Sequence, residues 1–85
     1  MKKFEVHYEL VFEKYNNAVP GRMDVKLGEE MTDEEGNIYT VNNEEDAEQY
    51  VYDFYYHNME SDMVDLPKQY DGDTHLEVLK VKRLF

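Results

Sequence analysis

The stretch Phe4-Glu5-Val6-His7-Tyr8-Glu9-Leu10-Val11-Phe12 alternates between apolar and polar residues along almost its whole length. Every even-numbered position is aromatic or aliphatic, and every odd-numbered position except Val11 is polar. Successive side chains of a strand point to opposite faces, so this alternation predicts a half-buried strand over residues 3–13.

Two shorter segments that follow also carry strand patterns. Residues 22–27 alternate after Asn16-Asn17 and Pro20-Gly21, which are typical of turns. Residues 28–37 are polar and acidic and predict a loop with a turn at Glu35-Gly36-Asn37, and residues 38–41 predict a short third strand.

The last predicted strand, residues 74–84, changes phase partway along. Leu76 and Val78 share one parity, whereas Leu79 and Val81 share the other. A β-bulge near Val78-Leu79 explains this change, and so does burial of both faces as a central strand.

Charge places this last strand beside the first. Glu5, Glu9 and Glu13 lie on the polar face of the first strand, and Lys80 and Lys82 lie on the last. Opposite charges on neighbouring strands stabilise a sheet, so we expect the two strands to pair.

One helix is predicted between the third and last strands. Asn42 and Asn43 are N-cap candidates, because their side chains can accept hydrogen bonds from the first helical N–H groups. Asn58 can supply a left-handed C-cap, so the helix is expected from about Asn43 to about Met59. The residues that recur at helical spacing and should face the sheet are Ala47, Tyr50, Val51, Phe54 and Tyr55.

Together these elements predict a single acidic α+β domain over residues 1–85. Its expected order is β-β-(β)-α-β, a three- to four-stranded, mostly antiparallel sheet with one amphipathic helix packed on one face. Residues 60–73 are expected to form a loop before the last strand.

Composition limits the classes of partner. Twenty acidic residues against nine basic ones give a net charge of −11, which disfavours direct binding to nucleic acid or to an anionic membrane. The chain has no cysteine, and its first residues resemble neither a signal peptide nor a membrane span. We therefore expect a cytoplasmic location, in a bacterial or host cell.

The acidic residues are concentrated in the middle of the chain. No Lys or Arg occurs from Leu27 to Pro67, and the bases cluster toward the two ends. This asymmetry predicts a molecule with one strongly negative side.

The polar face of the predicted helix is the first candidate site. Tyr52 and Tyr56, four residues apart, lie near Glu45 on the side opposite the sheet-facing residues. Aromatic side chains among carboxylates can bind Arg through hydrogen bonds, ion pairs and cation–π contacts. Two readings stay open: the rings are exposed as an interface, or residues 60–73 cover them.

The second candidate is an acidic belt formed by the 29–35 loop, the helix start and residues 60–65. Spaced carboxylates can occupy a site that otherwise binds phosphates, although solvated charge that only maintains solubility fits the same pattern. The predicted partner-binding residues of the two candidates are Glu29, Glu30, Asp33, Glu34, Glu35, Glu45, Glu48, Gln49, Tyr52, Asp53, Tyr56 and Glu60.

Metal binding and catalysis find little support. Asp71, Asp73 and His75 lie close in sequence, but neither they nor the acidic 29–35 loop fits the spacing of a calcium loop. Ser61 is the only serine, and His7 and His57 are dispersed, at expected surface positions. We therefore expect no metal, no cofactor and no enzymatic activity.

The helical stretch from Asn43 to Tyr56, NEEDAEQYVYDFYY, sets acids beside tyrosines within the base-free region. In size and in this style of surface the chain resembles the small acidic proteins of phages and mobile elements that inhibit host nucleic-acid enzymes, among them anti-CRISPR and anti-restriction proteins. It departs from them in its basic ends, at Lys80, Lys82 and Arg83 for example, which favours a one-sided patch over mimicry by the whole surface.

The resemblance implies an inhibitor that docks an acidic, tyrosine-bearing surface into the basic groove of a nucleic-acid-handling protein. The alternative is a structural or adaptor module with a solubilising acidic surface. Such a module could be a homodimer that pairs through the open face of the sheet or through an edge strand such as residues 21–27.

Overall fold

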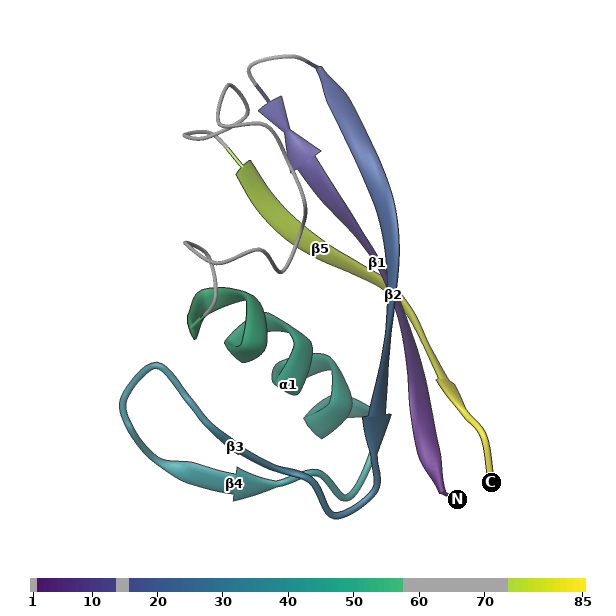
Figure 1. Cartoon of the computed structure of the whole chain (residues 1–85), viewed down its shortest axis with the longest axis vertical. Helices are drawn as coiled ribbons and strands as arrows, with labels where there is room; N and C mark the ends of the chain where they lie inside the picture. Colours follow the sequence, from purple (N-terminus) through teal and green to yellow (C-terminus); the bar gives the residue numbers. More distant parts are fainter. Residues whose placement is uncertain (1, 14–15, 58–73) are drawn as a thin grey trace.

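Three ten-residue strands form the main sheet of the computed structural model, which describes residues 2–13, 16–57 and 74–85. The strands are β1 (Lys3–Phe12), β2 (Asn17–Lys26) and β5 (Thr74–Arg83). Their order is β2-β1-β5 and both pairings are antiparallel (Figure 1). This confirms the predicted α+β class and the pairing of the last strand with the first.

Strand β2 begins earlier than predicted, at Asn17, so the expected turn at Pro20-Gly21 is wrong. Pro20 lacks an N–H group, but β2 is an edge strand, where the missing donor costs no ladder hydrogen bond. Gly21 lies opposite Tyr8, and a Cβ at Gly21 would lie only 2.5 Å from the Tyr8 ring. The chain turns at Asn16, which has a φ of 49° and donates its N–H to the Glu13 carbonyl.

The change of phase in β5 is a β-bulge. His7 lies opposite Lys80 and Tyr8 lies opposite Val78, so Leu79 has no partner on β1. The bulge returns Val81 to the buried side of the sheet, opposite Val6. The first explanation is therefore confirmed, and the second is wrong because β1, not β5, is the central strand.

A second, two-stranded sheet lies apart from the first. Its strands are β3 (Glu30–Thr32) and β4 (Ile38–Thr40), paired antiparallel. Strand β4 confirms the predicted third strand, whereas β3 lies within the segment predicted to be a loop. The turn between them confirms the prediction near Gly36, which has a φ of 89°, and is held by the Asp33 carboxylate.

Helix α1 (Glu44–His57) starts with the predicted cap. The Asn43 side-chain oxygen accepts a hydrogen bond from the Asp46 N–H at 2.8 Å, and the Asp46 carboxylate accepts one from the Asn42 N–H at 2.9 Å. The first bond satisfies an N–H group that the helix itself leaves without a partner, and the second ties the chain before the helix to its first turn. The predicted extension to Met59, the Asn58 cap and the 60–73 loop lie outside the described residues.

The helix lies between the main sheet and the β3–β4 hairpin (Figure 1). The even-numbered side chains of β1 form the core together with Ala47 and Val51 of α1. Tyr50, Tyr52 and Tyr55 are partly buried and pack against this core. Burial of these apolar side chains drives the association of helix and sheet. The buried residues of the core are Phe4, Val6, Tyr8, Leu10, Phe12, Val25, Val41, Ala47, Val51 and Leu76.

Candidate partner-binding surface

The β3–β4 hairpin covers one side of the helix that was predicted to face solvent. The Tyr39 hydroxyl donates a hydrogen bond to the Asp53 carboxylate at 2.6 Å, and the Gln49 side-chain amide contacts both carboxylate oxygens at 3.1 Å. Asp53 is consequently only 1% exposed. The prediction that Asp53 lies on the exposed face is wrong, because the pairing of β3 with β4, which places Tyr39 against the helix, was not predicted.

Tyr39 holds its hydroxyl proton more strongly than an exposed phenol does. Burial, and secondly the hydrogen bond to Asp53, raise the pKa of the Tyr39 hydroxyl well above its ordinary value. The phenol therefore keeps its proton at neutral pH and remains a donor. A buried carboxylate with such a donor avoids the cost of an unpaired charge.

Tyr52 is half-buried and does not project freely into solvent. Its hydroxyl oxygen accepts a hydrogen bond from the Val78 N–H at 3.0 Å, next to the bulge in β5. Of the two readings left open, the one in which Tyr52 is freely exposed does not hold, because the ring reaches the edge of the sheet. Whether residues 60–73 also cover the helix concerns residues outside those described.

Four predicted residues remain exposed on the helix: Glu45, Glu48, Gln49 and Tyr56. At about 100° per residue they occupy an arc of about 100° on one side of α1. Tyr56 is 43% exposed and is the one large aromatic side chain of this arc that the solvent reaches freely. We call these four residues the acidic strip.

The acidic residues of the hairpin divide into two groups. Glu29 and Asp33 are partly buried, and the Asp33 carboxylate is occupied by the N–H groups of the turn. Glu30, Glu34 and Glu35 are exposed. Glu30 and, at the hairpin tip, Glu34 and Glu35 are thus the hairpin carboxylates available to a partner.

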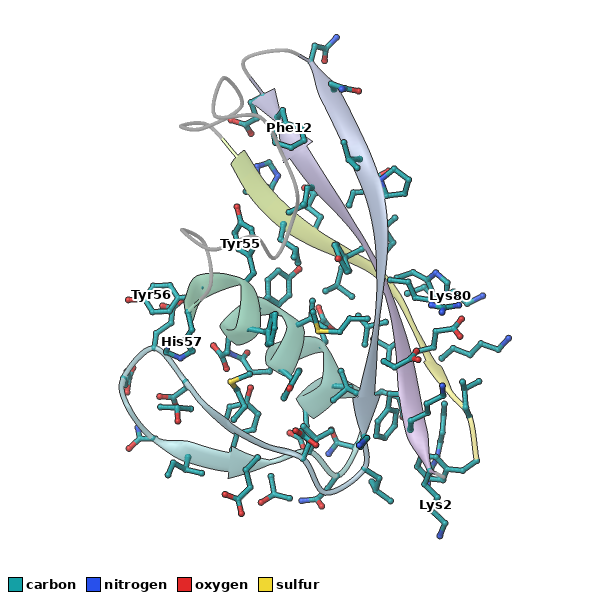
Figure 2. All side chains as sticks on the ribbon, in the orientation of Figure 1. Lys2, Phe12, Tyr55, Tyr56, His57 and Lys80 are labelled. Atoms are coloured by element: carbon teal, nitrogen blue, oxygen red, sulfur yellow. The ribbon has the colours of Figure 1, made fainter. Side chains whose placement is uncertain are left out.

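The hairpin and the end of the helix meet through His57. The Nε2–H group of His57 donates to the backbone carbonyl of Thr32 at 2.8 Å, which assigns the proton to that nitrogen. The Tyr56 and His57 rings are in edge-to-face contact, with centroids 5.3 Å apart. Figure 2 shows both residues at the end of α1 that lies beside the hairpin turn, so Tyr56 and the hairpin turn lie on the same side of the molecule.

Charge is segregated between the layers. Residues 28–57, which form the hairpin and the helix, contain ten acidic residues and no Lys or Arg. The cations of β1, β2 and β5 lie on the main sheet, and Arg83 reaches the helix start, where it pairs with Glu44 at 3.7 Å. The helix–hairpin layer is therefore the negative side of the molecule.

Within residues 2–13, 16–57 and 74–85, no three His, Asp or Glu side chains lie close enough together to hold a metal ion. Asp71, Asp73, Ser61 and the predicted binding residue Glu60 lie outside those ranges. In the same part of the chain, α1 is too short and too polar to cross a bilayer.

Tyr39, Thr32 and His57 are the residues of this surface that sequence reasoning missed. The pairing of β3 with β4 brings Tyr39 and Thr32 to the helix, and no local pattern in the sequence marks that contact. No protein-family model matches the chain, and neither the curated proteins nor the solved structures include a significant match.

Proposed function

We propose that this protein is a non-catalytic binding module that docks its helix–hairpin layer into the basic groove of a nucleic-acid-handling protein. It would act as an inhibitor by occupying the place of nucleic acid. The observation that carries the proposal is the segregation of charge: ten acidic residues without a base on the layer that also exposes Tyr56.

The chemistry of the layer suits such a groove. Glu45 and Glu48 of the acidic strip, with Glu34 and Glu35 of the hairpin tip, offer carboxylates to Arg and Lys side chains that otherwise bind phosphates. Tyr56 adds an aromatic surface for an Arg side chain or for apolar contact. The net charge of −11 would accelerate encounter with a basic partner and make association sensitive to salt.

The layer is also held in one shape. The Tyr39–Asp53 bond and the His57–Thr32 bond tie the hairpin to the helix, and Asp33 holds the turn that carries the tip carboxylates. Groups held in place before binding lose less conformational entropy on association. This rigidity supports the proposal for a binding surface over one for solvated charge alone.

The test is affinity capture from nuclease-treated lysate with three immobilised proteins. These are wild type, the surface variant Glu48→Lys, and the control Glu13→Lys, which makes the same charge change at an exposed position outside the layer. We expect wild type and control to retain the same nucleic-acid-binding protein and the surface variant to lose it. Equal recovery by all three proteins, or no dependence on salt, contradicts the proposal.

A further inference from the structure

The main sheet has one face without a partner layer in the described structure. Helix α1 packs on the side formed by the even-numbered residues of β1, so the odd-numbered residues form the opposite side. Lys80 points away from α1 on that side (Figure 2). We call this side the outer face, and its residues on the three strands are Lys3, Glu5, His7, Glu9, Val11, Ala18, Pro20, Arg22, Asp24, Lys26, His75, Glu77, Lys80 and Lys82.

The outer face carries opposite charges at its two ends. At one end Lys3 lies opposite Lys26, and His7 lies between Arg22 and Lys80. At the other end the acidic residues gather: Glu9 lies directly opposite Glu77, and Glu13 follows β1. The centre of the face is thus a boundary between a positive half and a negative half.

This arrangement is unfavourable for a single copy. Like charges directly opposite each other on neighbouring strands destabilise a sheet, and Glu9 with Glu77 is such a pair. Two ion pairs relieve the positive half, Lys3 with Asp24 at 3.0 Å and Arg22 with Glu5 at 3.8 Å. In the negative half, His75 contacts Glu77 at 3.2 Å and Glu13 at 3.5 Å. The Glu9–Glu77 pair itself has no Lys or Arg directly opposite it on a neighbouring strand, where β2 instead presents Pro20.

We propose that two copies of this chain associate through their outer faces about a twofold axis. The axis runs in the plane between the two sheets. It crosses the strands at a right angle and passes β1 between His7 and Glu9. Each strand then lies over the same strand of the second copy in reverse direction, so Lys80 faces Glu77 of the second copy. By the same symmetry His7 faces Glu9 of the second copy, and every contact occurs twice.

A second copy fits this face better than a polyanion does. A polyanion would be attracted by the positive half but repelled by Glu9 and Glu77, whereas a rotated copy matches both halves.

Pairing through the strand edges is less favourable than pairing through the face. Pro20 interrupts the donors of β2, while the bulge at Leu79 and the Tyr52 contact to Val78 occupy β5. A face of three ten-residue strands measures about 34 by 14 Å, or roughly 950 Å² for two copies. This area is below the usual size of a permanent interface, so the dimer is weak and depends on its charges.

The experiment is sedimentation equilibrium over a range of protein concentrations in about 0.15 M salt, where charges more than about 8 Å apart are largely screened. Wild type is expected to gain mass with concentration. Lys80→Glu and Glu77→Lys each place like charges across the axis and should stay monomeric. An equimolar mixture of the two variants should associate again, because both contacts then pair Glu with Lys, and so should the double variant Lys80→Glu/Glu77→Lys.

The matched control is Glu48→Lys on the acidic strip. This substitution brings the net charge from −11 to −9, as Glu77→Lys does, but residue 48 does not lie on the outer face. The Glu48→Lys variant should therefore associate at least as well as wild type. A monomeric wild type at all concentrations, a mixture that stays monomeric, or a Glu77→Lys variant that associates like Glu48→Lys overturns the proposal. The proposal is also overturned if wild type is monomeric and binds a duplex DNA probe that the Lys80→Glu variant does not bind.

Discussion

The Tyr39 hydroxyl lies 2.6 Å from the Asp53 carboxylate, a contact that joins the β3–β4 hairpin to helix α1. The side-chain amide of Gln49, one turn earlier in the helix, donates to the same Asp53 carboxylate. Because Asp53 is buried, its carboxylate depends on these two donors for the hydrogen bonds that water would otherwise supply. The contact therefore determines both the stability of the hairpin and the shape of the proposed binding surface.

Tyr39→Phe should lower the free energy of unfolding by about 1–3 kcal/mol, because it leaves a buried acceptor short of a donor. Urea denaturation followed by circular dichroism measures this loss. Tyr56→Phe removes a hydroxyl from an exposed ring and should change stability by no more than about 0.5 kcal/mol. Equal effects of the two substitutions would show that the hairpin contact contributes little.

Alkaline pH should destabilise the fold. Burial is the first cause that raises the pKa of Tyr8, Tyr39, Tyr50 and Tyr55 above the ordinary value of 10.0. The fold thus favours the protonated phenols, so their contribution is complete below pH 10 and is lost as pH rises above it. Urea midpoints measured from pH 8 to pH 11 should fall above pH 10, and Tyr39→Phe should show a shallower fall than wild type.

Gly21→Ala should destabilise the protein by about 1–3 kcal/mol through overpacking. The added methyl group would lie 2.5 Å from the buried ring of Tyr8. In a Tyr8→Leu background the ring is absent, so the same substitution should cost less. A double-mutant cycle by urea denaturation measures this coupling, and an equal cost in both backgrounds would remove the ring as the cause.

Tyr52→Phe should expose the edge of β5. It removes the acceptor of the Val78 N–H, so amide hydrogen exchange at Val78 should become faster and stability should fall by about 1 kcal/mol. Tyr56→Phe serves as the control and should leave exchange at Val78 unchanged. If Val78 exchanges at the wild-type rate in Tyr52→Phe, the hydroxyl does not protect this edge.

Local patterns predicted the main elements of the fold. The alternation of residues 3–13, the phase change at Val78-Leu79 and the cap at Asn43 each depend on neighbours in sequence, and the structure confirms all three. The turn predicted at Pro20-Gly21 is wrong because both residues belong to an edge strand, and that strand is formed by pairing with β1, where Gly21 lies opposite Tyr8. Strand β3 lies in a polar, acidic segment, and it is a strand because it pairs with β4, which the local sequence does not indicate.

The candidate surface could be predicted only in part for the same reason. A helical wheel divides α1 correctly when one layer packs on it, but here the hairpin packs on a second side and buries Asp53. Tyr52 is long enough to leave its predicted face and reach Val78. Glu45, Glu48 and Tyr56 lie where neither contact reaches and remain exposed as predicted. Gln49 also remains exposed, although its amide donates to Asp53.

Competition for one captured partner tests the proposed inhibition most directly. A labelled duplex DNA bound to that purified protein is titrated with wild type, with Glu48→Lys and with Glu13→Lys, and fluorescence anisotropy reports the bound DNA. If the helix–hairpin layer occupies the nucleic-acid groove, wild type and the control release the DNA at the same concentration, whereas the surface variant requires at least tenfold more, a loss of about 1.4 kcal/mol. A ternary complex in which the partner holds wild type and DNA at once would contradict it.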